Sequence, residues 1–227
     1  RPMKVLALET SCETASLALL CDGQLHTQSF VSPPAHSAVL LPAVRALLAG
    51  QGVRLADLDV IAFGRGPGAF TGVRLACSVA QGLAVGADLP LAQVDSLMAL
   101  AEAAGADKVV CAMDARMGEA YVACYQREAG GWRVEQAPVC VAPEAMPRPA
   151  GSGWVGVGTA FAAYPACQQV LGEAVRVQDP SAVPTAAAVA RLAADVAWLD
   201  PALVSPLYVR DRVAQTVAER LAAGGKA

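Results

Sequence analysis

Hydrophobic and polar residues alternate along this chain with the periods of strands and helices in turn. Apolar runs predict strands at residues 5–8, 15–20 and 24–31, with Asp22 and Gly23 in the turn between the last two. Apolar residues at helical spacing follow at 37–49 and 73–85. Further strands are predicted at residues 59–63, 92–94, 108–113, 120–125, 132–135 and 155–157. Strands that alternate with helices indicate an α/β protein with a mixed sheet.

The remaining segments carry weaker patterns. Asp95 or Ser96 is placed to cap a helix that runs to residue 104. Residues 138–153 are rich in proline and glycine and are expected to form a loop. Helices are predicted at residues 159–171, 185–199 and 212–222.

An internal repeat emerges when the chain is shifted by 105 residues, since residues 7–11 then fall on 112–116. Both copies have a strand, an acidic residue, a polar turn and a second strand. A real repeat predicts two related halves, 3–105 and 106–227, with Glu9 and Asp114 facing the cleft between them. Because the identity is low, a chance match is the alternative.

Composition narrows the class of protein. The net charge is −3, from 17 Lys and Arg against 20 Asp and Glu, which argues against a stand-alone nucleic-acid binder. The 55 % apolar content excludes a disordered chain. The longest uncharged stretch, residues 149–172, contains five glycines and two prolines and does not resemble a membrane span. We expect a soluble cytoplasmic protein whose seven cysteines are mostly buried thiols.

The glycine-rich block at residues 64–74 is the most distinctive segment. Glycines let a backbone approach an anion, and the block opens a helix, so Gly66, Gly68 and Thr71 are candidates for a phosphate site. It is neither a Walker A loop nor a G-x-G-x-x-G fingerprint. The alternative is a tight turn that lets the next helix pack closely.

Catalytic candidates are few. Glu9 and Asp114 could hold Mg²⁺ or a water near a phosphate, or could accept hydrogen bonds in turns. Thr10 and Ser11 follow the first strand, and Arg116 could bind a carboxylate or phosphate or pair with Glu119. Neither H-x-x-x-H nor H-E-x-x-H is present, so no metal site is expected. A G-x-S-x-G elbow, which would present a serine nucleophile, is also absent.

The two central helices suggest a surface for a partner. The first is apolar on two sides, and the second has small residues at Gly72, Ala76 and Ala80 that permit close helix contact. Burial within the domain is the alternative. The candidate contact residues are His36, Leu40, Leu41, Val44, Leu48, Gly72, Leu75, Ala76, Val79, Ala80 and Leu83.

Five segments resemble the TsaB (YeaZ) family in family order: residues 6–11, 36–42, 64–74, 114–121 and 206–211. Residues 66–72 form the most specific of them, although the family usually has serine where Ala69 stands. Glu9 stands where many members have aspartate. The resemblance implies an actin/sugar-kinase-like fold of duplicated mixed sheets flanked by helices.

The resemblance also implies a function. Members are non-catalytic subunits of the complex that transfers a threonylcarbamoyl group to N6 of an adenosine of tRNA. They bind the transferase TsaD, or form homodimers, through the helices that follow His36 and Gly72. An ATPase, TsaE, is the third component, so ATP is used by the complex, and contact with tRNA is indirect.

The catalytic relative binds a metal through two histidines, at positions that match Ser96 and Leu100 here, so the resemblance implies that the metal site is lost. Two alternatives remain, a nucleotide-binding enzyme of the actin/sugar-kinase superfamily and a glycoprotease-like peptidase.

Overall fold

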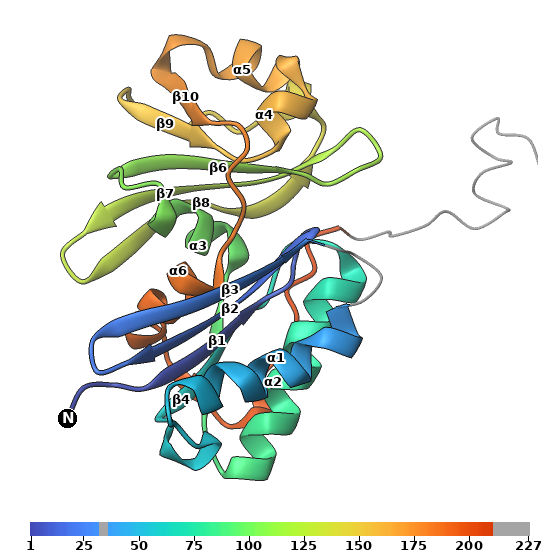
Figure 1. The fold of residues 1–227 in the computed structure, drawn as a ribbon. Coiled ribbons are helices and arrows are strands. Elements are labelled where there is room, and N and C mark those ends of the chain that lie inside the picture. The colour runs from blue at the N-terminus through green and yellow to red at the C-terminus, as the bar shows by residue number, and fades with distance from the viewer. Residues whose placement is uncertain (32–35, 211–227) are drawn as a thin grey trace, which may run out of the picture.

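The computed structural model describes residues 1–31 and 36–210, which form two stacked lobes (Figure 1). The first lobe is built on a six-stranded sheet in the order β11-β5-β4-β1-β2-β3. β1 runs antiparallel to β2 and parallel to β4, so the sheet is mixed. Its strands are β1 (Val5–Glu9), β2 (Thr14–Cys21), β3 (Gln24–Val31), β4 (Val60–Gly64), β5 (Leu91–Val94) and β11 (Trp198–Leu199).

The second lobe repeats this design in a five-stranded sheet ordered β10-β9-β6-β7-β8. β6 runs antiparallel to β7 and parallel to β9, as β1 does to β2 and β4. Glu9 ends β1 and Asp114 ends β6, in agreement with the repeat of 105 residues. The strands are β6 (Lys108–Asp114), β7 (Ala120–Glu128), β8 (Gly131–Val141), β9 (Trp154–Val157) and β10 (Val175–Asp179).

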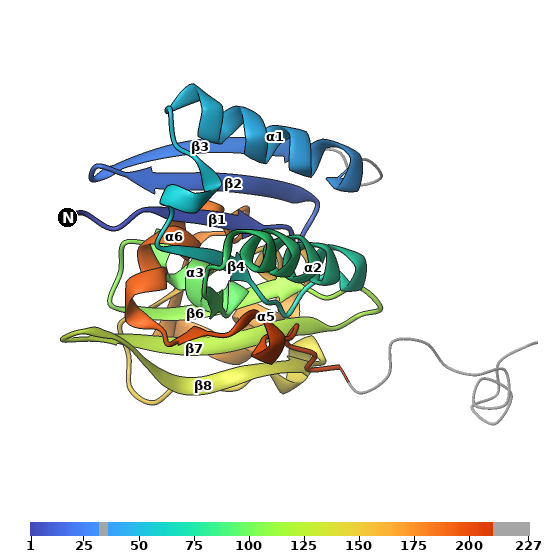
Figure 2. The same cartoon turned by 90° about the horizontal axis from the view of Figure 1, so that it is seen from below.

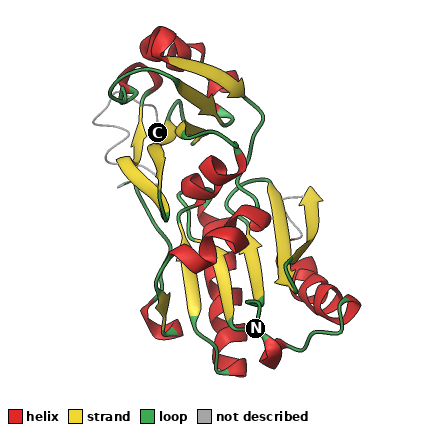
Figure 3. Ribbon diagram, turned by 90° about the vertical axis from the view of Figure 1, so that its left-hand side faces the viewer, coloured by secondary structure: helices red, strands yellow, loops and turns green. Residues whose placement is uncertain are grey.

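The helices form three layers around the two sheets (Figures 1 and 3). α1 (His36–Gly50) and α2 (Phe70–Ala87) cover the outer face of the first sheet. α3 (Ser96–Ala103) and α6 (Ala186–Leu192) lie between the sheets. α4 (Ala160–Ala163) and α5 (Pro165–Leu171) cover the outer face of the second sheet. The duplicated mixed sheets flanked by helices are those of the actin/sugar-kinase-like class.

Successive side chains of each strand point to opposite faces of the sheet and fill the layers on both sides. Leu6 and Leu8 of β1 pack toward α1 and α2, whereas Val5 and Ala7 pack toward α6. The face toward α6 is lined largely by alanines, which permit the helix to lie close to the sheet. This layer holds the two lobes together, because α3 packs its Leu97 and Leu100 against the second sheet.

Several predicted elements differ from the structure. The helix predicted at 159–171 is divided into α4 and α5, because Pro165 lacks an N–H and begins a new helix. The helix predicted at 185–199 ends at Leu192, and β11 follows where Trp198 pairs with Ala92. β8 extends to Val141, inside the predicted loop 138–153, and β10 was not predicted.

The predicted boundary between the halves 3–105 and 106–227 lies between α3 and the first strand of the second lobe, but the second half is not confined to the second lobe. α3 ends at Ala103 and β6 begins at Lys108. α6 and β11, however, return to the first lobe and complete its sheet. The predicted helix at 212–222 lies outside the described residues.

By length and composition alone, α2 is the one helix of the described ranges that could cross a membrane. Its buried residues Val73, Ala76, Cys77, Ala80 and Ala84 face the sheet. A helix that packs one face on a globular domain can meet the same criteria, so they are weak evidence for a membrane span.

Candidate functional site

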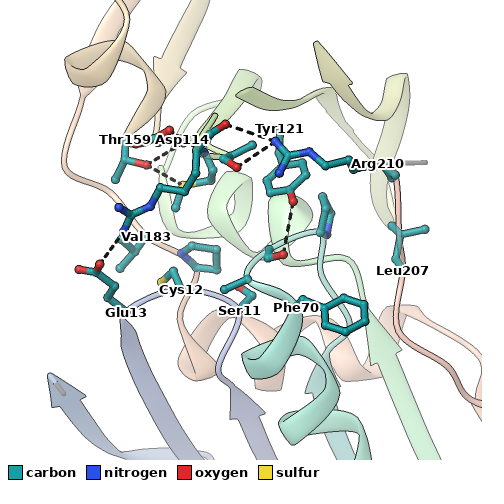
Figure 4. A pocket seen from close by; sticks show the side chains of 18 of the residues that line it. Ser11, Cys12, Glu13, Phe70, Asp114, Tyr121, Thr159, Val183, Leu207 and Arg210 are labelled. Carbon is teal, nitrogen blue, oxygen red and sulfur yellow. Dashed lines mark hydrogen bonds and ion pairs between the residues drawn. The ribbon is translucent and has the colours of Figure 1, made fainter. Parts of the chain in front are cut away.

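A cleft of about 750 Å³ lies between the lobes (Figure 4). Most of its lining comes from the turn after β1, the glycine-rich loop before α2, the turn after β6, and residues 207–210. The lining is completed by Tyr121, Thr159, Val183 and Pro184. Ser11, Gly68, Asp114 and Arg116 are the predicted phosphate or nucleotide residues that reach this lining. Glu9, Thr10, Gly66 and Thr71 do not reach it.

Glu9 is fully buried and does not face the cleft, contrary to the prediction. One carboxylate oxygen accepts a hydrogen bond from the Ser11 amide at 2.9 Å, and the other accepts one from the Ser96 hydroxyl at 3.0 Å. Burial raises the pKa of Glu9 above its ordinary value of 4.5, although these hydrogen bonds act in the opposite direction. Glu9 therefore ties the turn after β1 to the first residue of α3.

The glycines of the loop are required by close packing against the turn after β1. A Cβ on Gly68 would lie 2.4 Å from the Ser11 carbonyl oxygen, and one on Gly72 would lie 1.9 Å from that of Thr10. The Thr10 hydroxyl donates to the Gly72 carbonyl, and the Ala69 amide donates to the Ser11 carbonyl at 2.7 Å. These contacts explain why glycine is needed at Gly68 and Gly72: the loop is a tight turn packed against the turn after β1. This was the alternative to a phosphate site.

Asp114 and Arg116 belong to the second lobe. The Asp114 carboxylate accepts hydrogen bonds from the Tyr164 hydroxyl at 2.7 Å and from the Arg116 amide at 2.9 Å. The Arg116 guanidinium reaches across the cleft to Glu13, 2.6 Å away, rather than to Glu119. Since Glu9 and Asp114 have different partners and only Asp114 lines the cleft, they do not form a carboxylate pair there.

Ser96 and Leu100, which the resemblance matches to the metal ligands of the catalytic relative, have structural contacts here. Ser96 donates to Glu9 and accepts a hydrogen bond from the Gly66 amide at 3.0 Å. Leu100 packs in the core between α3 and the second sheet. Within the described ranges, no group of three His, Cys, Asp or Glu side chains is arranged to hold a metal ion.

Cys12 is the thiol that lines the cleft. Burial, together with the charge of Glu9, raises the pKa of Cys12 to about 12. A thiol with this pKa remains protonated at neutral pH and is a poor nucleophile. This weighs against the glycoprotease-like alternative.

α1 and α2 lie on the outer side of the first lobe (Figure 2), and the residues exposed there differ from the predicted contact set. Leu41 is 48 % exposed, while Leu75, Val79 and Leu83 are half-buried along α2. The side chain of His36 lies outside what the structure describes, and Gly72 packs against Thr10. Leu40, Val44, Leu48, Ala76 and Ala80 are buried in the core beneath the helices and are unavailable to a partner.

The predicted contact set omits three exposed apolar residues of these helices, Val39, Phe70 and Val85. Phe70 lines the cleft and packs on Tyr208, so it does not belong to the outward face. The exposed apolar residues of the outward face are therefore Val39, Leu41 and Val85, none of which fills the core.

Residues 206–212 mix apolar and charged side chains. The described part packs on the domain. The Leu207 amide donates to the Arg65 carbonyl at 2.7 Å, and the Arg210 guanidinium donates to the Ala115 carbonyl at 2.9 Å.

Comparison with known proteins identifies the family. The family model described as "TsaD: tRNA N6-adenosine threonylcarbamoyltransferase" matches residues 31–225. The tRNA threonylcarbamoyladenosine biosynthesis protein TsaB of Escherichia coli is 38 % identical over 224 residues, which cover 93 % of this chain and 96 % of that protein. The chain belongs to the TsaB family. TsaB of Haemophilus influenzae is 39 % identical over 175 residues, covering 71 % of this chain and 74 % of that protein.

Solved structures support the same assignment. The structure of YeaZ from Pseudomonas aeruginosa superposes with a TM-score of 0.82 at 38 % identity, covering 91 % of this chain and all of that one. A second crystal structure, described as an uncharacterized protein with similarity to peptidase YeaZ from Pseudomonas aeruginosa, gives 0.84 at the same identity and covers 92 % and 100 %. Members of the TsaB family thus share the whole two-lobed architecture described above.

Proposed function

We propose that this chain is the accessory subunit of the complex that transfers a threonylcarbamoyl group to N6 of an adenosine of tRNA. The observation that carries the proposal is the match to TsaB along nearly the full length of both chains. The protein has no chemistry of its own in this proposal; the transferase TsaD supplies it. TsaE consumes ATP for the complex, tRNA is contacted indirectly, and the complex acts in the cytoplasm.

The outward face of α1 and α2 is the proposed docking surface for TsaD. It presents Leu41 to solvent beside the half-buried Leu75, Val79 and Leu83. An exposed apolar face on two adjacent helices is typical of a protein interface. Docking there stabilises the catalytically competent state of TsaD, provided that the face binds this state more tightly than the inactive state of TsaD. A second copy of this chain would compete for the same face.

The activity is tested by reconstitution. TsaD, TsaE, tRNA and threonylcarbamoyl-adenylate are combined with and without this protein, and modified adenosine is quantified. Product that requires both TsaD and this protein is expected. Product without this protein, or from this protein alone, would overturn the proposal.

The docking surface is tested with two matched variants. Leu41→Arg places a charge on the proposed face, and Val134→Arg places one on β8 of the other lobe at the same 48 % exposure. We expect Leu41→Arg to weaken TsaD binding at least about tenfold in a calorimetric titration, and Val134→Arg to bind normally. Equal affinity of the two variants would place the interface elsewhere. Sedimentation of each variant without TsaD reports on the homodimer.

Nucleotide binding in the cleft is the second candidate. It is favoured by the position of the cleft between duplicated lobes and by Ser11, Gly68 and Asp114 in its lining. Asp114→Asn, rather than a change of the buried Glu9, is the informative variant. ATP binding by the isolated protein that weakens in Asp114→Asn would support this candidate, and the absence of binding would exclude it.

A further inference from the structure

Residues 207–210 contact both lobes where they face each other across the cleft (Figure 4). On the side of the first lobe, the Leu207 amide donates to the Arg65 carbonyl at 2.7 Å. The Tyr208 ring packs on Phe70 of α2, with 5.3 Å between the ring centroids. The Tyr208 hydroxyl also accepts a hydrogen bond from Arg74 of α2 at 3.0 Å.

On the side of the second lobe, Arg210 contacts the turn between β6 and β7. Its guanidinium donates to the Ala115 carbonyl at 2.9 Å and to the Arg116 carbonyl at 3.3 Å. It lies 3.4 Å from the Glu119 carboxylate, and 5.6 Å separate it from the centre of the Tyr121 ring. The Arg210 side chain is 13 % exposed, so the guanidinium itself is largely shielded from water, whereas the side chain of Glu119 is 38 % exposed.

The two anchors are close together along the chain. Only Val209 separates Tyr208 from Arg210, so about 7 Å of backbone joins the contacts on the two lobes. Such a short connection has almost no slack, and the lobes cannot separate at this point unless one anchor breaks. The segment before it is fixed as well, because Val204 is buried in the core of the first lobe.

The other contacts across the cleft are weaker. The Arg116–Glu13 ion pair is exposed on both sides, at 72 % and 67 %, and pairs of this kind contribute little. The hydrogen bond from the Tyr121 hydroxyl to the Gly68 carbonyl is long, at 3.4 Å. Residues 207–210 therefore supply the strongest described connection across the cleft.

We propose that residues 207–210 form an interlobe clamp that fixes the separation of the two lobes. Tyr208 anchors the clamp on the α2 end of the first lobe, and Arg210 anchors it on the β6–β7 turn of the second. The clamp holds the two lobes together with a segment of the same chain. In a protein without such a segment, a ligand bound between the lobes would have to do this. Release of either anchor lets the cleft widen around the layer of α3 and α6.

The clamp is tested by measuring the distance between the lobes. Spin labels carried by noncanonical amino acids replace Gln28 on β3 and Arg176 on β10, two exposed positions in different sheets. The seven cysteines make thiol labelling unselective. The doubly labelled protein is studied as Arg210→Ala, Tyr208→Ala, the double variant and Arg148→Ala, the last an exposed arginine of the same lobe as a control.

We expect a single narrow distance distribution in the parent and in Arg148→Ala, and a longer population in each of the two anchor variants. Because both anchors serve one clamp, the double variant should show no more of this population than either single variant. A distribution unchanged in Arg210→Ala would overturn the proposal. So would independent, additive effects of the two substitutions, which indicate separate local contacts.

Hydrogen exchange provides a second test. The Leu207 amide is bonded to the Arg65 carbonyl of the first lobe, whereas the Ala115 and Glu119 amides are bonded within the β6–β7 turn, so Leu207 is the amide that reports on the clamp. If the two anchors hold as one unit, the Leu207 amide should exchange about tenfold faster in Arg210→Ala, as loss of a charge-assisted hydrogen bond implies, while β1 and β4 keep their protection and show that the variant is folded. Unchanged exchange of Leu207 would contradict the clamp.

Discussion

At the scale of single residues, the same amino acid serves different purposes according to what lies beside it. Gly72 lies in the first turn of α2, where the backbone of Thr10 leaves no room for a Cβ atom. Gly82 lies in the same helix, yet a Cβ there would have no neighbour within 4 Å. The sequence marks both as helical glycines, and only the packing distinguishes them.

Alanine substitutions at these two glycines should have opposite effects. Gly72→Ala should lower the free energy of unfolding by about 2 kcal/mol or more, because backbone must move to admit the methyl group. Gly82→Ala should raise it by about 0.5–1 kcal/mol, since alanine is the better helix former. Urea denaturation of the two variants and the parent measures both changes. Equal changes in the free energy of unfolding would show that the glycine-rich loop can move to admit the methyl group at little cost.

Glu9 is a second residue whose behaviour depends on its surroundings, here through its pKa. Its pKa is raised in the folded protein, so between its ordinary pKa and the raised value the folded state binds more protons than the unfolded state. The contribution of Glu9 to stability is therefore largest at low pH and decreases as the pH rises through that interval.

The Glu9→Gln variant isolates this contribution. Glutamine resembles the protonated carboxyl group and does not titrate. The parent should therefore lose stability relative to Glu9→Gln as the pH rises from about 4.5, the ordinary value. The difference in unfolding free energy, measured by denaturant titration from pH 4 to 8, should change with pH in that direction. A difference that is independent of pH would mean that the fold does not alter this pKa.

At the scale of elements, one face of α2 packs on the first sheet and the opposite face lies partly open to solvent. Ala76 and Ala80 are fully buried against the first sheet, whereas Leu75, Val79 and Leu83 lie partly open on the outward side. The stripe of small residues permits close packing, as the sequence suggested, but of the helix on its own sheet. The outward stripe is the part left for a partner.

Charged substitutions on α1 and α2 should therefore separate folding from docking. Ala76→Arg places a guanidinium in a site with no exposure and should destabilise the protein by several kcal/mol or prevent folding. Leu41→Arg should melt within a few degrees of the parent, because its side chain already meets solvent. Thermal denaturation followed by circular dichroism compares them. A folded, stable Ala76→Arg protein would contradict this assignment of faces.

At the scale of the whole molecule, the two lobes are not independent stretches of chain. α6 and β11 come from the end of the described sequence and complete the first lobe. α6 covers Val5, Val60 and Val94, which residues 1–105 alone would leave in contact with water. The clamp of residues 207–210 adds a second connection on the cleft side.

A fragment of residues 1–105 should consequently fail to form a stable sheet. It lacks α6 and β11, and exposure of the apolar face beneath them removes most of the burial energy on that side. Circular dichroism and denaturation should show little cooperative structure in this fragment. Co-expression with a fragment of residues 106–227 is the control and should restore the fold. Cooperative unfolding of the isolated fragment would show that the first lobe folds without its returning segment.

The sequence alone determined much of this protein. Apolar periodicity located the strands of both sheets except β10 and β11, because a buried strand or helix face is encoded locally. The repeat of 105 residues anticipated the duplicated topology, and five segments in family order indicated the TsaB family. The glycine-rich block was singled out because glycine is needed wherever backbones approach closely.

Only the tertiary structure decided which faces remain open. Glu9 was predicted beside Asp114 but is buried against Ser96, 87 positions away in the chain. Trp198 and Leu199, at the end of the predicted helix at 185–199, form β11 instead because they pair with the edge strand β5. The clamp depends on contacts of Arg210 with residues more than 90 positions earlier. Such pairings arise from the path of the whole chain, so no local pattern of residues encodes them.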